Sequence, residues 1–191
     1  MTTLRIFGIA DDSIVDGPGI RFAVFTQGCT HGCVGCHNPG AQTFGGGREA
    51  TLEELERQIE ANPLLAGITL TGGEPFEQAA PLRELAHWAR ARGLTVWAYS
   101  GYTFEELVSG TPSAEARELL TLVDVLVDGP YEAAQASHAL TWRGSANQRI
   151  IDVPASLAAG EAVQVDRGVD RGTGLFVNPM CQSDVSTVTS P

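Results

Sequence analysis

Lysine is absent from this sequence, and its twelve lysine-or-arginine positions are all arginine. Without a lysine amino group, Schiff-base formation and catalysis by a lysine base are excluded. Positive charge is also scarce overall, because the formal net charge is −11. Such a balance argues against a surface that follows nucleic-acid phosphates. We therefore expect no nucleic-acid partner.

Long apolar runs are missing as well. No stretch approaches the roughly 18 consecutive apolar residues that indicate a membrane-spanning helix. The N-terminus carries Arg5, Asp11 and Asp12 and has no unbroken apolar segment, so we expect no signal peptide. These features predict a cytoplasmic protein that does not interact with a membrane. With 191 residues, 43% of them hydrophobic and 18% charged, the chain is not an acidic disordered one and is long enough to bury a core.

Cysteine is sparse and unevenly placed. Three of the four cysteines form the pattern Cys29-x3-Cys33-x2-Cys36, and Cys181 lies far away near the C-terminus. A disulfide framework is typically an even, dispersed set in an exported chain. The clustered trio therefore indicates metal or redox chemistry.

Strand and helix patterns alternate through the middle of the chain. Strands are predicted at residues 22–26, 67–71, 94–99, 123–127 and 149–152, with helices from residue 51 and at 81–92, 103–108 and 113–120. This alternation predicts an α/β fold with a parallel sheet and right-handed crossovers. There are too few βα units to close an eight-stranded barrel, so we expect an open, partial parallel βα barrel.

The alternation weakens beyond residue 154, and no repeat or second domain is evident. We expect a core at residues 1–153, an extension of the same domain at 154–182, and a disordered tail at 183–191. Short strands are possible at residues 163–165 and 175–177.

The unusual motifs share one position relative to the strands. The cysteine cluster follows the first predicted strand, Gly72-Gly73-Glu74-Pro75 follows the second, Ser100 begins a turn after the third, and Asp128-Gly129-Pro130 follows the fourth. The C-terminal ends of parallel strands form one rim, where ligands bind in this class of fold. The motifs are therefore expected to converge on a single site.

Several chemistries fit the cysteine cluster. A tetrahedral zinc site could use the three cysteines with His31 or His37, although structural zinc usually joins two separated pairs of ligands. Cys33 to His37 matches the C-x-x-C-H haem-attachment pattern, which leaves Cys29 unexplained. A redox dithiol leaves one cysteine without a role, and three incidental loop cysteines are the structural alternative.

An iron–sulfur cluster fits the three closely spaced cysteines best. A cubane cluster normally takes four thiolates, one on each iron. Three thiolates from one short loop would leave the fourth iron open to a small-molecule ligand. Cys181 is a less suitable fourth ligand, because it lies in a weakly patterned segment.

These motifs resemble those of the radical S-adenosylmethionine (SAM) superfamily. The segment from Ser13 to Cys29, followed by Cys36-His37-Asn38-Pro39, is similar to the N-terminal signature of the glycyl-radical-enzyme activases. Within that group, residues 126–130 and 142–149 resemble the activases of anaerobic ribonucleoside-triphosphate reductases. The resemblance covers residues 4 to about 153 and implies the partial barrel of the radical SAM type.

The resemblance implies a role for several residues. Cys29, Cys33 and Cys36 would bind a 4Fe-4S cluster, and SAM would chelate its open iron through its amino and carboxylate groups. Gly72, Gly73 and Glu74 would hold the SAM ammonium group; the structural alternative is an ordinary strand-to-helix turn. Gly35, Cys36 and His37 would face the adenine side. Ser100 is a candidate for the ribose hydroxyls, or else a turn residue.

Other polar residues of the resembling segments have less defined roles. Asp16 and Arg21 lie in a turn that is near the site in the activases. Asp128 could lie across the site from the cluster. Arg143, Asn147, Gln148 and Arg149 suit partner docking or the carboxylate of the methionine moiety.

The implied function is that of a radical SAM oxidoreductase. Reductive cleavage of SAM gives methionine and a 5′-deoxyadenosyl radical, which generates a glycyl radical on the large subunit of anaerobic ribonucleotide reductase. A flavodoxin or ferredoxin would suit as the electron donor. The alternatives are an activase of another glycyl-radical enzyme, of the formate-lyase type, and a non-catalytic zinc or iron–sulfur binding module.

Overall fold

A computed structural model of the chain describes residues 2–165. The expected short strand at 175–177, Cys181 and the expected tail at 183–191 lie outside the described residues, so the domain boundaries remain predictions. Within residues 2–165, every helix is too short or too polar to span a bilayer.

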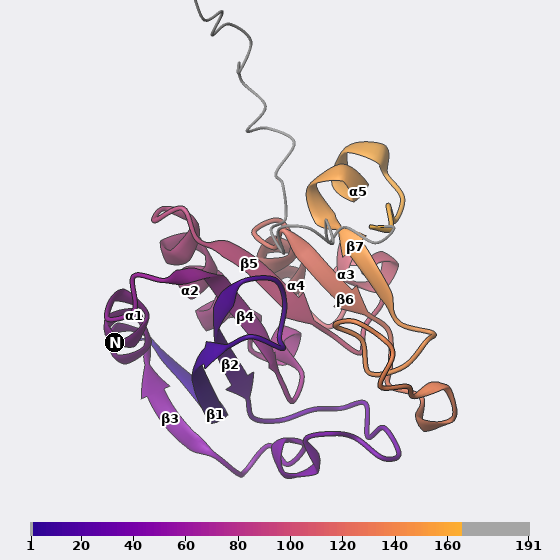
Figure 1. The fold of residues 1–191 in the computed structure, drawn as a ribbon, viewed down its shortest axis with the longest axis horizontal. Coiled ribbons are helices and arrows are strands. Elements are labelled where there is room, and N and C mark those ends of the chain that lie inside the picture. The colour runs from indigo at the N-terminus through magenta and orange to yellow at the C-terminus, as the bar shows by residue number, and fades with distance from the viewer. Residues whose placement is uncertain (1, 166–191) are drawn as a thin grey trace, which may run out of the picture.

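The described residues form one seven-stranded sheet in the order β3-β1-β2-β4-β5-β6-β7 (Figure 1). The strands are β1 (Thr3–Ser13), β2 (Ile20–Thr26), β3 (Arg48–Thr51), β4 (Leu65–Gly72), β5 (Thr95–Tyr99), β6 (Val125–Asp128) and β7 (Arg149–Asp152). The central four, β2, β4, β5 and β6, are parallel. The predicted open α/β sheet is therefore confirmed.

The edges of the sheet differ from the expected parallel pattern. β1 pairs antiparallel with both β2 and β3, and β7 pairs antiparallel with β6. β1 and β3 were not among the predicted strands, because their alternation is interrupted by glycine, acidic and other polar residues. The expected strand at 163–165 is reduced to a single bridge between Ile151 and Gln164.

Helices α1 (Leu52–Glu60), α2 (Ala79–Arg90), α3 (Phe104–Ser109) and α4 (Ala114–Leu120) lie on one face of the sheet, and α5 (Val153–Ala159) follows β7. Short 3-10 turns are η1 (Pro39–Ala41), η2 (Pro75–Gln78) and η3 (Ala133–Gln135). The predicted N-terminal caps are present, since the side chain of Thr51 accepts a hydrogen bond from Glu54 N and Thr103 forms a capping box with Glu106.

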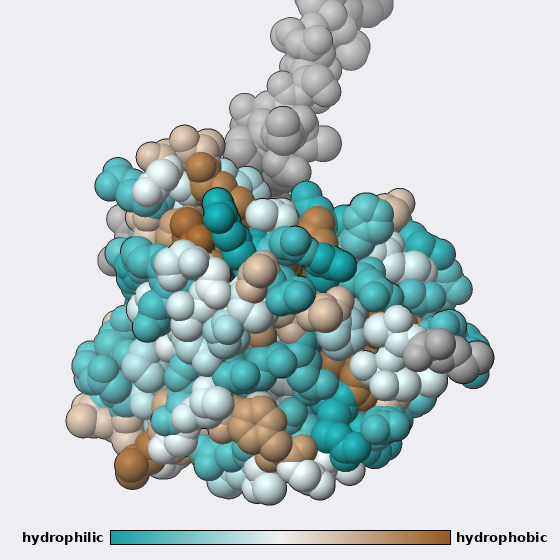
Figure 2. Space-filling view, turned by 180° about the vertical axis from the view of Figure 1, so that it is seen from behind, coloured by the Kyte–Doolittle hydropathy of each residue, from teal (hydrophilic) through white to brown (hydrophobic). Residues whose placement is uncertain are grey.

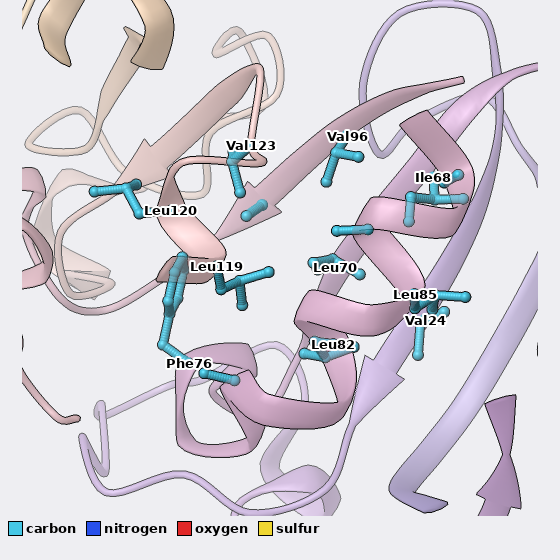
Figure 3. Packing of buried hydrophobic residues seen from close by; sticks show 14 of the residues in the cluster. Val24, Ile68, Leu70, Phe76, Leu82, Leu85, Val96, Leu119, Leu120 and Val123 are labelled. Carbon is cyan, nitrogen blue, oxygen red and sulfur yellow. The ribbon is translucent and has the colours of Figure 1, made fainter. Parts of the chain in front are cut away.

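The main core lies between these helices and the sheet. In Figure 3, Leu82 and Leu85 of α2 lie over Leu70 and Ile68 of β4, and all four side chains are fully buried. Because side chains alternate along a strand, the neighbouring residues face the other side of the sheet. There Trp97, with two valines of β6, forms a second, smaller cluster.

A buried arginine organises this second face. Arg21 is fully buried and donates hydrogen bonds to Thr69 Oγ1 (2.7 Å) and to the carbonyl oxygens of Ile68 (2.6 Å) and Pro18 (3.3 Å). Burial lowers the pKa of the guanidinium to about 10. Thr69 in turn donates to the carbonyl oxygen of Asp16 (2.7 Å). Arg21 therefore fixes the turn that enters β2 and is itself a structural residue.

Candidate functional site

A cavity of about 460 Å³ opens at the C-terminal ends of the parallel strands. This volume lies within the range of small-molecule sites, roughly 300–1,000 Å³. Each of the four loops that follow β2, β4, β5 and β6 contributes to its lining, as in Cys29, Glu74, Ser100 and Gly129. The predicted convergence of the motifs on one site is therefore confirmed.

Most of the residues predicted for the site line this cavity. They are Cys29, Cys33, Cys36, His37, Gly72, Gly73, Glu74 and Ser100. Gly35 is not among the lining residues; it has a positive φ of 77°, and a side chain there would contact Tyr131 and Ala133. Asp16 also lines the cavity, with Val15 beside it.

The cysteine loop, residues 27–47, is attached to the sheet through its backbone. Gly28 N donates to the carbonyl oxygen of Ala41 (2.7 Å), and Cys29 N donates to that of Gln42 (3.0 Å). Glu74 N donates to the carbonyl oxygen of Gly28 (2.8 Å), which joins the loop to the end of β4. The position of Cys29 therefore depends directly on the Gly-Gly-Glu segment.

The three thiols of the loop are free and only partly buried. The pKa of the Cys29 thiol is raised, chiefly by burial. Cys36 Sγ accepts a hydrogen bond from Asn38 N (3.4 Å). Three free thiols that line one cavity are a suitable donor set for an iron–sulfur cluster, whose irons each take one thiolate.

A single-ion site is less well matched by the geometry. Within residues 2–165, no three histidine, cysteine, aspartate or glutamate side chains come together as a group that could hold one metal ion. His31, one of the histidines considered for zinc, is already hydrogen-bonded to Glu74. His37 instead packs its ring against Tyr131, with ring centroids 4.7 Å apart.

Glu74 is the buried centre of the site. Its carboxylate is hydrogen-bonded to Ser100 Oγ (3.0 Å), Gly101 N (2.8 Å), Phe76 N (3.1 Å) and His31 Nε2 (3.0 Å). Its side chain is only 1% exposed, so these four contacts replace the water that a carboxylate would otherwise bind. Glu74 thus joins the ends of β4 and β5 to the cysteine loop.

The contact between His31 and Glu74 was not predicted from the sequence, where His31 was considered only as a zinc ligand. Its hydrogen bond to Glu74 is the largest cause that raises its pKa, against the opposing effect of burial. Its ring also meets Tyr102 edge-on, with centroids 4.5 Å apart. Only its position between Cys29 and Cys33 could have suggested a role.

A second set of contacts supports the same loop. Thr30 Oγ1 and Tyr102 OH both donate to Glu77 Oε1, each at 2.8 Å. Burial is the main reason that the pKa of Tyr102 is raised, to about 12. The tyrosine therefore remains a neutral hydrogen-bond donor at neutral pH, and the start of the cysteine loop is held by two carboxylates.

Two polar residues named in the sequence are engaged with each other. Arg149 donates to both carboxylate oxygens of the buried Asp128, at 2.9 and 2.5 Å, and also to Glu105. These hydrogen bonds, first to Asp128, raise the pKa of Arg149. Both groups therefore hold β6 to β7, and Arg149 is not free to bind a ligand.

Gly73 is closely packed, so the addition of a single methyl group in Gly73→Ala tests its role. A Cβ at Gly73 would lie 2.3 Å from the carbonyl oxygen of Gly28 and 2.9 Å from that of Ala41. Gly73→Ala must displace the cysteine loop, and we expect it to lower the free energy of unfolding by about 1–3 kcal/mol. Reconstituted protein should also retain less iron than the parent.

The matched control for Gly73→Ala is Gly45→Ala. A Cβ at Gly45 in the same loop would meet nothing within 4 Å. This variant should unfold within about 0.5 kcal/mol of the parent and keep its iron. Urea unfolding and iron assays measure both quantities, and equal losses in the two variants would contradict the packing argument.

Comparison with known proteins agrees with this geometry. Residues 15–151 match the family model described as a 4Fe-4S single cluster domain. The chain belongs to this radical SAM family. Membership favours the iron–sulfur interpretation of the cysteines over zinc, haem attachment or a dithiol.

Three curated relatives of this chain, from different sources, are each named anaerobic ribonucleoside-triphosphate reductase-activating protein. The relative from Pasteurella multocida is 38% identical, and the match covers 72% of this chain and 90% of that protein. The relatives from phage T4 and Escherichia coli K12 are 34% and 33% identical, over 71% of this chain and 86% and 90% of theirs. A solved structure, QueE from Escherichia coli, matches 53% of each chain with 17% identity and a TM-score of 0.42.

Proposed function

We propose that this chain is the activating enzyme of an anaerobic ribonucleoside-triphosphate reductase and generates a glycyl radical on its large subunit. The observation that supports this most strongly is the joining of three free cysteines and the Gly-Gly-Glu segment in one cavity. The same name is shared by the curated relatives described above.

Cys29, Cys33 and Cys36 are the ligands of the proposed cluster. They leave one iron of a 4Fe-4S cluster without a protein ligand, which is the position that SAM requires. When bound and reduced, the cluster supplies one electron to cleave SAM into methionine and a 5′-deoxyadenosyl radical, which takes a hydrogen atom from a glycine of the partner. The protein needs no acid or base for that abstraction.

The chain's own residues bind and orient SAM in this proposal. Gly72 and Gly73 allow the backbone at the end of β4 to approach the ammonium group closely. Glu74 supplies negative charge there and fixes the surrounding turns through its four hydrogen bonds. We assign Ser100 to the ribose hydroxyls, and Gly35, Cys36 and His37 to the adenine side.

The proposed activity also implies the partners of this chain. The substrate is a glycine in a loop of a large protein, so the open cavity suits it better than a closed pocket. We propose a flavodoxin or ferredoxin as the electron donor, in the cytoplasm. Seen from behind in Figure 2, the surface is largely hydrophilic, with hydrophobic residues in small separate groups.

Anaerobic reconstitution tests the function directly. The proposal predicts a brown protein with about four irons per chain and 5′-deoxyadenosine formed from SAM under reducing conditions. Zinc in place of iron would support a non-catalytic binding module. Cleavage of SAM without a glycyl radical on the reductase would instead indicate an activase of another glycyl-radical enzyme.

A further inference from the structure

Arg143 is an arginine of the cavity that the site described above does not use. It follows β6, in the loop of residues 129–148 that leads to β7, which we call the β6–β7 loop. In the part of the chain that the structure describes, it is the one arginine that lines the cavity. Arg21 and Arg149 do not line it, and each is occupied by the contacts already given.

The charge of Arg143 has no partner among residues 2–165. None of the ion pairs there includes it, and its Nη1 donates to the carbonyl oxygen of Gln148 (3.0 Å). Its Nε is buried without an acceptor. A buried donor left without a partner costs free energy, so this group is suited to an acceptor that arrives with a ligand.

The β6–β7 loop holds Arg143 in place. Gln148 Oε1 accepts hydrogen bonds from Gly144 N (2.8 Å) and Ser145 N (3.2 Å), and its Nε2 donates to the carbonyl oxygen of Gly129 (3.0 Å). The guanidinium is therefore attached to the same glutamine that fixes its backbone. A side chain held in this way loses little further freedom on binding a ligand.

The backbone immediately before Arg143 is strained. Trp142 has a φ of 53°, in the left-handed region that a non-glycine residue rarely adopts. Its ring packs edge-on against Trp97, with centroids 5.2 Å apart. This packing joins the β6–β7 loop to β5, and both Trp142 and Arg143 line the cavity.

Tyr131 connects this loop to the proposed cluster ligands. A Cβ at Gly144, the neighbour of Arg143, would lie 3.0 Å from the Tyr131 ring. A Cβ at Gly35, between Cys33 and Cys36, would lie 3.6 Å from the same ring. The two loops thus meet through one aromatic side chain, which also packs against His37.

We infer that Arg143 binds the α-carboxylate of the methionine moiety of SAM, an inference that rests on the proposed function. The cavity then has a negative group, Glu74, at the end of β4 and a positive group, Arg143, beyond the end of β6. An α-amino acid moiety carries the two complementary charges. Guanidinium forms strong, directional hydrogen bonds with carboxylates, so the unpaired Nε and its neighbouring nitrogen match this ligand.

The test compares two ligands on cluster-loaded protein without the reductase. Binding of SAM and of its decarboxylated analogue is measured by equilibrium dialysis for the parent, Arg143→Gln, Arg143→Lys and the control Arg57→Gln. Arg57 is exposed on α1 and has no part in the cavity. Iron content and unfolding curves of all variants establish that they are folded and loaded.

We expect Arg143→Gln to weaken SAM binding roughly ten- to a hundredfold, the usual effect of removing a hydrogen bond to a charged group. Arg143→Lys should recover part of that affinity, and Arg57→Gln should bind as the parent does. The decarboxylated analogue should bind Arg143→Gln and the parent equally, because the carboxylate that Arg143 contacts is missing.

Three outcomes would overturn the inference. Equal SAM affinity of Arg143→Gln and the parent shows that Arg143 does not bind the cofactor, and a defect seen only with the reductase assigns it to the partner instead. An equal loss for both ligands shows that it does not contact the carboxylate. No SAM binding by the cluster-loaded parent would overturn the proposed function itself, and this inference with it.

Discussion

Replacing Cys33 with alanine should abolish reductase activation, by at least about a hundredfold. The variant removes one of three thiolates that hold the proposed cluster, and two thiolates from one loop do not retain a cubane cluster. Iron per chain should fall well below that of the parent, and no 5′-deoxyadenosine should form from SAM. Iron assay, visible absorbance and chromatography of the nucleoside measure these results on the same preparation.

Cys181→Ala is the matched control for this prediction. The same thiol-to-methyl change is made, but at a cysteine outside the Cys29-x3-Cys33-x2-Cys36 pattern. It should keep the iron content and SAM cleavage of the parent. If Cys181→Ala lost the cluster and Cys33→Ala kept it, the assignment of the ligands would be wrong.

Glu74→Gln should be the most damaging single change outside the cysteines. An amide offers one acceptor atom where the carboxylate offers two, and its NH2 group would face donors such as Gly101 N and His31. We expect the free energy of unfolding of the apo protein to fall by about 2–4 kcal/mol, the range for a buried charged acceptor that loses its pairing. SAM cleavage by the reconstituted variant should fall at least about a hundredfold.

Glu77→Gln provides the comparison for Glu74→Gln. Glu77 accepts from Thr30 and Tyr102, but the first of these contacts is exposed and the second is only partly buried, so water replaces most of what is lost. We expect a loss below about 1 kcal/mol. Urea unfolding of the two apo variants under the same conditions compares their free energies of unfolding. Equal stability losses would show that Glu74 does not hold the site together.

Much of the architecture could be predicted from local patterns. The parallel strands are short apolar runs, and helix starts such as Thr51 and Thr103 have their capping residues in the sequence. The edge strands β1 and β3 could not be predicted in this way. Their residues are mixed in polarity, and they are strands because they pair with one another and with β2.

The candidate site was also predictable only in part. Its motifs could be predicted to converge, because each follows a strand and parallel strands end at one rim. The contacts between the loops could not be predicted, since His31 and Glu74 are 43 positions apart in the sequence. The distinction between Arg143 and Arg149 also required the fold, because one motif contains both and only the latter has acidic partners.

Electron paramagnetic resonance of the partner tests the central claim most directly. The anaerobically reconstituted protein is reduced and mixed with SAM and the anaerobic ribonucleotide reductase of the same organism. The account predicts a persistent organic doublet on the reductase that is absent with Cys33→Ala. No doublet and no 5′-deoxyadenosine, from protein shown to hold its cluster, would contradict it.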